Sequence, residues 1–157
     1  MVLVAALATG AILLFGSSEE PKSAPGTVSY PKTFVLASGD VVSVYDGDTF
    51  KVDLQGVHPL FGKEVSIRVN GIDAPEIKGQ SEEVEALARQ ARDLVKTTLE
   101  GATAIELRNP RRGKYFRILA DVYGDGESLA GKLKLAGLAK AYDGQGAKPT
   151  WEAKENP

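Results

Sequence analysis

The chain has 157 residues, which is enough for one domain with its own hydrophobic core. It has no cysteine and a single histidine, His58, so disulfides, thiolate metal sites and histidine-built zinc sites are excluded. Any metal must be bound by oxygen, which favours calcium or magnesium. The net charge of −2 argues against a protein that coats nucleic acid by bulk charge, but not against an enzyme with a local basic groove.

The first sixteen residues are almost entirely apolar. This run is short for a membrane helix, which needs roughly 20 residues, and suits the core of a signal peptide. The usual basic residues before such a core are missing, so an uncleaved anchor remains an alternative. We expect residues 1–18 to be a signal peptide or an N-terminal membrane anchor, in which 1–16 would form the tether. We therefore expect an extracytoplasmic protein.

Residues 19–31 are rich in Ser, Glu, Pro, Lys and Gly without periodicity, which predicts a flexible linker. The globular domain is then expected over 32–142. Its first predicted strand covers 34–45, bent at Gly39, and the second covers 49–54.

Between these two strands lies Asp46-Gly47-Asp48-Thr49. An Asp-Gly step in this position is typical of a hairpin turn, because glycine accepts a positive φ without strain. The simplest interpretation is a surface turn in which Asp46 bonds its own backbone. Asp48 stands out, because aspartate is disfavoured at the start of a strand.

After a predicted loop over 55–63, residues 64–72 alternate as a third strand, with Arg68 off the core face. The acidic run Asp73-Ala74-Pro75-Glu76 follows directly. Hard carboxylate oxygens suit calcium, and arginine binds phosphate through paired hydrogen bonds, so the two acidic clusters indicate a calcium and phosphate site. Each of these residues alone also fits an ordinary solvated surface position.

A long helix is predicted from the N-cap Ser81 to Gly101. A strand over 103–107, a turn over 109–113 and a strand over 114–123 follow. In the last strand, Arg117 faces away from the side that carries Phe116, Ile118, Ala120 and Val122.

Asp125-Gly126 predicts a turn, and Ser128 predicts the cap of a short helix that runs to about Ala136. Residues 138–142 are expected to be extended. Residues 143–157 form the C-terminal tail, in which Trp151 could hold part of the tail against the domain.

The predicted order is β-β-β-α-β-β-α. This order fits an α+β, mainly β fold, a five-stranded OB-fold Greek-key barrel with two helices. A fold of this kind does not by itself assign a function.

Several segments, taken in order, resemble the staphylococcal nuclease (thermonuclease) family. They are Asp46-Gly47-Asp48-Thr49, Arg68, Asp73-Ala74-Pro75-Glu76, Lys114-Tyr115-Phe116-Arg117 and Gly137-Leu138-Ala139-Lys140. The resemblance covers about residues 34–142. It implies an OB-fold and a calcium-dependent phosphodiesterase that cuts DNA and RNA.

The resemblance also assigns roles residue by residue. Asp48 and Asp73 match the calcium carboxylates, and Ala74 replaces a threonine whose backbone carbonyl binds the same ion. Glu76 matches the residue that positions or deprotonates the attacking water. Arg68 and Arg117 match the arginines that hold the scissile phosphate. The remaining matches and a neighbouring basic strip would line the substrate groove: Lys114, Tyr115, Tyr142, Arg111 and Arg112.

Two departures from the family pattern stand out. Phe116 takes the place of a glycine that often precedes the last catalytic arginine. After Tyr142, we expect a tail around Trp151 in place of the longer C-terminal helix of the best-known member. We expect a monomeric nuclease that acts on DNA or RNA. The alternative is a non-catalytic OB-fold module, tethered to the membrane, that binds nucleic acid or protein.

Overall fold

The computed structural model describes residues 32–151. The predicted signal peptide or anchor, the linker up to residue 31 and the tail residues 152–157 lie outside the described residues. The description below concerns the compact unit that begins at Pro31. Among the described residues, no helix is long and apolar enough to cross a membrane.

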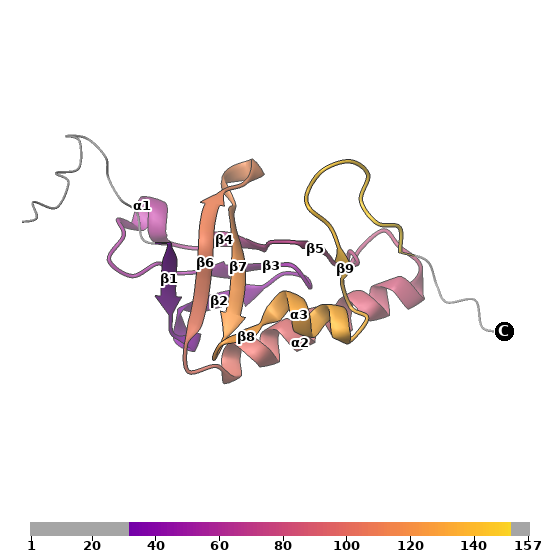
Figure 1. Ribbon diagram of the computed structural model, residues 1–157, viewed down its shortest axis with the longest axis horizontal. Helices are drawn as coiled ribbons and strands as arrows, with labels where there is room; N and C mark the ends of the chain where they lie inside the picture. Colours follow the sequence, from indigo (N-terminus) through magenta and orange to yellow (C-terminus); the bar gives the residue numbers. More distant parts are fainter. Residues whose placement is uncertain (1–31, 152–157) are drawn as a thin grey trace, which may run out of the picture. The chain divides into compact units, whose positions relative to one another are not determined.

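A mostly antiparallel sheet dominates the described unit (Figure 1). Its strands lie in the order β1-β6-β7-β4-β3-β2, and only β4 and β7 are parallel. The bounds are β1 Thr33–Leu36, β2 Val41–Val44, β3 Thr49–Val52, β4 Val65–Val69, β6 Ile105–Arg112 and β7 Ile118–Gly124. A short strand, β8 (Glu127–Ser128), pairs with β7. A second, two-stranded sheet joins β5 (Ile72–Asp73) to β9 (Lys140–Ala141).

The main sheet must be strongly curved. Strands β1 and β2 lie at opposite ends of its six-strand path, yet only residues 37–40 join them. In a flat sheet the two outer strands would be about 24 Å apart, at about 4.8 Å per neighbouring pair. A connection of this length reaches at most about 18 Å. The two ends of the sheet are therefore brought toward each other.

Helices α2 (Glu82–Gly101) and α3 (Leu129–Leu135) contact each other and the sheet (Figure 1). Ser81 is the N-cap of helix α2, and its hydroxyl accepts the N–H of Val84 at 3.4 Å. Its buried residues recur every three or four positions, as one helix face requires: Val84, Ala88, Ala91, Val95 and Leu99. Opposite them lie strand residues that are fully or almost fully buried: Phe50, Val52, Ile67, Val69, Ile105, Leu107, Ala120 and Val122.

The mainly β architecture with helices is confirmed, but the described residues contain more elements than five strands and two helices. The expected single strand over 34–45 is two strands that pair with different neighbours, separated by the 3-10 turn η1 (Ser38–Asp40). The predicted loop 55–63 contains the one-turn helix α1 (Pro59–Gly62). Turn η1 has three residues and helix α1 has four, so neither is long enough to produce a helical period in the sequence.

The turn predicted at 109–113 is wrong, because β6 continues through this segment to Arg112. Asn109 has a φ of 50°, and the pairing with β7 shifts register between Arg108 and Arg111. Asn109 and Pro110 therefore produce an irregularity within the strand rather than a reversal of the chain.

The chain reverses later, at the 3-10 turn η2 (Lys114–Phe116), so the strand predicted from Lys114 begins only at Ile118. Tyr115 and Phe116 have φ values of 56° and 60°, outside the strand region. Phe116 is 86% exposed, whereas Ala120 and Val122 face the core as predicted.

Gly47 is buried where the β2–β3 turn meets α2. A Cβ atom at this position would lie 2.6 Å from the Cβ of Ala91 and 2.7 Å from that of Ala74. Both distances are shorter than van der Waals contact, so any larger residue must push the turn away from the helix.

We expect Gly47→Ala to lower the free energy of unfolding by roughly 1–3 kcal/mol, the usual cost of overpacking a core. Gly39→Ala is the matched control, because a Cβ added at this glycine would have no atom of a neighbouring element within 4 Å. Urea unfolding of the two variants and the wild type measures the difference. Equal stability of the two variants would contradict the close packing at Gly47.

Candidate active site

The turn between β2 and β3 holds two buried carboxylates. The N–H groups of Tyr45 and Asp46 bond to the carbonyl of Thr49 at 3.0 and 3.3 Å and close the turn. Asp46 Oδ1 accepts the N–H of Asp48 at 3.0 Å. The predicted bond from Asp46 to its own backbone is therefore confirmed, but the turn is not on the surface, since Asp46 is 7% exposed and Asp48 2%.

Asp48 connects the turn to the next two strands. Its backbone carbonyl accepts the N–H of Val69 at 2.8 Å, and its Oδ2 accepts the N–H of Ala74 at 3.0 Å. Its Oδ1 accepts the hydroxyl of Thr49 at 2.9 Å and forms an ion pair with Arg68. Asp48 thus lies next to both Arg68 and Ala74, as the predicted site requires.

Arg68 lies between two buried aspartates. Besides Asp48, its guanidinium contacts Asp73 Oδ1 at 3.5 Å and donates to the carbonyl of Ile72 at 3.2 Å. Burial lowers the pKa of Arg68, the charges of Asp73 and Asp46 oppose this effect, and the like charge of Arg117 adds to it. An arginine stays cationic under such conditions, so the cluster holds one fixed positive charge between two carboxylates.

Glu76 and Asp73 also contact the segment that follows β9. Lys148 Nζ lies 2.9 Å from Glu76 Oε1 and 3.3 Å from Asp73 Oδ1. Trp151 Nε1 donates to Asp73 Oδ2 at 3.1 Å. The hydrogen bond to Glu76 raises the pKa of Lys148, with the charge of Asp73 in support and partial burial in opposition.

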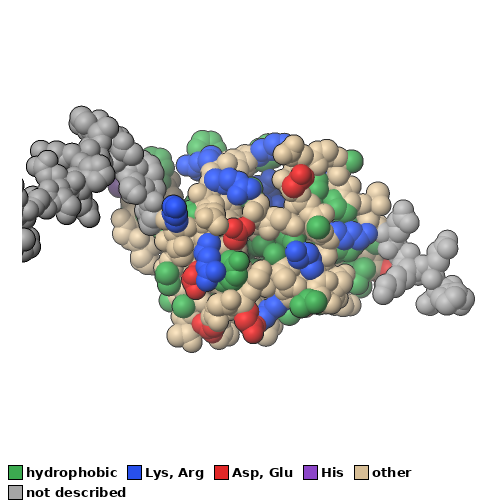
Figure 2. Space-filling model, viewed as in Figure 1, with side chains coloured by type: hydrophobic (Ala, Val, Ile, Leu, Met, Phe, Trp, Pro, Cys, Tyr) green, Lys and Arg blue, Asp and Glu red, His purple; other side chains and the backbone are tan. Residues whose placement is uncertain are grey.

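A groove of about 1060 Å³ opens over this cluster. Most of the predicted site residues line it: Arg68, Glu76, Arg111, Arg112, Lys114, Tyr115, Arg117 and Tyr142. Asp73 lines a smaller adjoining hollow of about 360 Å³ with Glu76, Lys148 and Trp151. Asp48 and Ala74 are buried beside Asp73. In the space-filling view, Lys and Arg side chains gather around a few acidic ones on this face (Figure 2).

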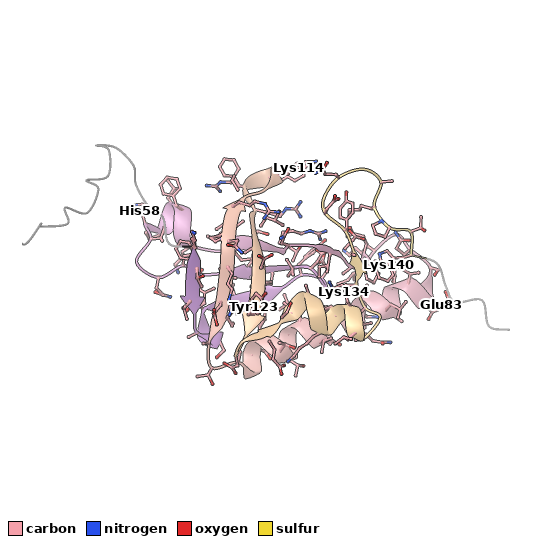
Figure 3. The ribbon with its side chains drawn as sticks, in the orientation of Figure 1. His58, Glu83, Lys114, Tyr123, Lys134 and Lys140 are labelled. Atoms are coloured by element: carbon pink, nitrogen blue, oxygen red, sulfur yellow. The ribbon has the colours of Figure 1, made fainter. Side chains whose placement is uncertain are left out.

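One wall of the groove is the tip of the β6–β7 hairpin. Arg111 donates to the side chain of Asn70 at 2.8 Å, and Arg112 donates to the carbonyl of Phe116 at 3.3 Å. The guanidinium of Arg117 lies 5.6 Å from the ring centroid of Tyr115, which is 85% exposed. Figure 3 shows Lys114 at this tip. The wall therefore carries both cationic and aromatic side chains.

The oxygen donors around Asp73 decide whether calcium can bind here. Within residues 32–151, no three side chains of the types His, Cys, Asp or Glu converge on one point. A site here would therefore rest on two carboxylates, a backbone carbonyl and water, all of which are hard oxygen donors that suit calcium. Lys148 already places a positive charge against Asp73 and Glu76, so this position accepts a cation. The donor atoms are therefore of the type that calcium prefers, and Arg68 also contacts both carboxylates.

Asp46 is a groove residue that the sequence interpretation assigned only to a turn. Burial, aided by the nearby charge of Glu76, raises the pKa of Asp46 to about 6, although Arg68 and two bonds with Thr49 oppose the rise. Because of the raised pKa, the carboxyl group of Asp46 keeps its proton in the folded chain at a pH where it has lost it in the unfolded chain.

The contribution of Asp46 to stability should therefore fall as the pH rises from about 4, near its unfolded pKa, to about 6. Asp46→Asn keeps an acceptor for the N–H of Asp48 but does not titrate. In calcium-free protein, the free energy of unfolding of this variant relative to the wild type should increase by roughly 2–3 kcal/mol from pH 4 to pH 7. Urea unfolding at both values measures the gain, and a difference that does not change with pH would contradict the raised pKa.

Of the charged residues that line the groove, the sequence interpretation gave no site role to Asp46, Asp143 and Lys148. A buried Asp46 could have been suspected from the second carboxylate two positions later. Nothing in the local sequence indicates that Lys148 meets Glu76. Arg108, which the sequence groups with Arg111 and Arg112 as a basic strip, is outside the groove: it pairs with Glu106 at 2.9 Å and lies 3.9 Å from the ring centroid of Tyr123.

Comparison with known proteins identifies the family of this chain. Residues 66–156 match the family model described as Staphylococcal nuclease homologue. The thermonuclease of Staphylococcus hyicus is 30% identical over 142 residues, which cover 90% of this chain and 78% of that protein. The chain therefore belongs to the staphylococcal nuclease homologue family, a family of nucleases.

Proposed function

We propose that this protein is a calcium-dependent phosphodiesterase that hydrolyses DNA or RNA by in-line attack of water. One observation carries the proposal: Arg68, Arg117 and Glu76 line the same groove, directly over the Asp48–Arg68–Asp73 cluster. Hydrolysis of a phosphodiester needs cations on the phosphate, an aligned water and a base, and this groove offers a candidate for each.

The two arginines would bind the scissile phosphate. Arg68 is fixed by its contacts with Asp48 and Asp73, so its position does not change with the substrate. Arg117 is held more loosely, by a 3.5 Å contact with the carbonyl of Lys114, and can follow the phosphate. Planar guanidinium groups give paired hydrogen bonds to phosphate oxygens and stabilise the charge that develops in the transition state.

Asp48, Asp73 and the carbonyl of Ala74 would hold calcium. The bound ion supplies positive charge that neutralises the phosphate and its developing negative charge. Asp48 already accepts the N–H of Ala74, so the two carboxylates and this residue are linked before any ion binds. Calcium tolerates such an irregular set of oxygens and completes it with water.

Glu76 would accept the proton of the attacking water. Its side chain is half exposed and lines the groove, unlike the buried Asp48 and Asp73. Water can therefore reach it. Lys114, Tyr115, Tyr142, Arg111 and Arg112 would bind the nucleic acid strand through phosphate contacts and base stacking.

The test is digestion of single-stranded DNA and RNA with calcium, then with an excess of chelator. We expect cleavage that requires calcium and returns when calcium is restored. Binding without cleavage would favour the alternative, a non-catalytic OB-fold module. Cleavage that persists in chelator would leave a nuclease without calcium dependence.

Three further points belong to the proposal. The curved sheet supports a partly open barrel of the OB type, with β1 and β2 at its opening. Export, or a membrane tether through residues 1–16, rests on the composition of that segment, which lies outside the described residues. A monomeric state remains a prediction from the sequence.

A further inference from the structure

The segment after β9 folds back to the acidic cluster. Gly144 and Gly146 have φ values of +85° and +69°, which allow the chain to turn, and the hydroxyl of Tyr142 donates to the carbonyl of Gly146 at 3.2 Å. Lys140 Nζ donates to the carbonyl of Thr150 at 2.7 Å and lies 4.6 Å from the ring centroid of Trp151. The loop after β9 in Figure 1 is thus held at both ends.

Two side chains of this segment occupy both oxygens of Asp73. Trp151 donates to Oδ2, while Lys148 lies against Oδ1 and also reaches Glu76 Oε1. The aspartate itself is 2% exposed, so the segment supplies much of the hydrogen bonding that replaces water there.

The two contacts differ in how easily they can be broken. The side chain of Lys148 is 53% exposed, so its ammonium can move into solvent, and Asp73 then keeps Arg68 and Trp151 as partners. Trp151 is partly buried, and its ring also contacts Lys140, so it is better fixed. A divalent cation at Asp73 would repel Lys148 but would leave the neutral donor of Trp151 unaffected.

We propose that Lys148 and Trp151 are two further residues of the metal site: Lys148 fills the cation position until a divalent ion displaces it, and Trp151 positions Asp73 for that ion. This inference rests on the proposed function. Lys148 is then an intramolecular competitor of calcium, whereas Trp151 is a positioning residue. The two side chains belong to one segment but should affect calcium affinity in opposite directions.

Calorimetric titration of the full chain with calcium chloride tests both roles. Lys148→Met should bind calcium roughly tenfold more tightly, if the competitor occupies the site about nine-tenths of the time. Trp151→Phe keeps the ring but loses the donor, and it should bind roughly tenfold more weakly, as is usual when a metal-binding carboxylate loses an outer hydrogen bond. Lys134→Met, on the exposed side of α3 (Figure 3), is the matched control and should bind like the wild type.

A second readout follows Lys148 directly. Acetylation of lysine amines by an N-hydroxysuccinimide ester, read by mass spectrometry, should increase at Lys148 when calcium is added and stay constant at Lys134. An increase together with the opposite affinity changes supports the inference.

Other outcomes overturn it. If the Lys148 and Trp151 variants change affinity in the same direction, the segment acts only by packing. Unchanged labelling of Lys148 on calcium binding would rule out its displacement. If neither the wild type nor Lys148→Met binds calcium, both the proposed calcium function and this inference fail. If the two proteins bind calcium with equal affinity, only this inference fails.

Discussion

Arg68→Ala is expected to lower both turnover and stability, whereas Arg117→Ala should lower turnover alone. Arg68 is the partner of two aspartates that are 2% exposed, so its removal leaves buried negative charge uncompensated. Breaking such a buried pair costs roughly 3–5 kcal/mol. Arg117 has no comparable partner among the described residues, since the contacts found for it are with the Lys114 carbonyl and the exposed Tyr115 ring.

Both substitutions should reduce turnover at saturating substrate by roughly 10²- to 10³-fold, because each removes a group that stabilises transition-state charge. Urea unfolding of each variant, measured beside its turnover, separates the two effects. Arg89→Ala, on the exposed surface of α2, should change neither quantity. If Arg117→Ala destabilised the fold as much as Arg68→Ala, the assignment of Arg117 to the substrate alone would be wrong.

The parts of the fold that the sequence predicts well are those with a repeating pattern. Alternation over 49–54 and 64–72 predicted β3 and β4, and the Ser81 cap with the Gly101 end predicted α2 to within a residue. Each of these elements buries one face, and local geometry fixes the spacing of the apolar residues on that face. The order of apolar and polar residues in a short segment therefore predicts the element.

The hairpin tip and the tail carry no such pattern. The register shift after Arg108 depends on how β6 pairs with β7, not on the preference of Asn109 and Pro110 for turns. Lys148 and Trp151 meet their acidic partners across 72 and 78 residues of chain. Trp151 holds the tail against the domain, as the sequence predicted. Single-sequence periodicity does not report contacts at that separation, so its partner Asp73 could be identified only in the folded chain.

The candidate site was predictable to a similar extent. The acidic and basic residues come from the β2–β3 turn, β4, the segment at β5 and the β6–β7 tip, and the resemblance to a family supplied their grouping. What it could not supply is the environment of each carboxylate. Asp48 and Asp73 are buried and paired, whereas Glu76 is half exposed and faces the groove, and this difference in solvent access favours separate roles for them.

The second large effect is expected when these roles are separated by mutation. Glu76→Gln keeps the shape of the side chain and an acceptor for Lys148 but removes the base. It should reduce turnover by roughly 10²- to 10⁴-fold, the usual value of general-base catalysis. Added calcium should not restore the activity, because the missing step is acceptance of the proton from water.

Asp48→Ala should behave differently. It removes a charged oxygen from a site with few ligands, so calcium should bind more weakly, and part of the activity should return as calcium is raised. It also leaves the N–H of Ala74 without its 3.0 Å acceptor, so the variant must first be shown to fold by circular dichroism. Turnover across a calcium titration, with the exposed Glu100→Gln as control, distinguishes the two variants. Wild-type turnover in Glu76→Gln would falsify the general-base role, and rescue of Glu76→Gln by calcium would instead make Glu76 a metal ligand.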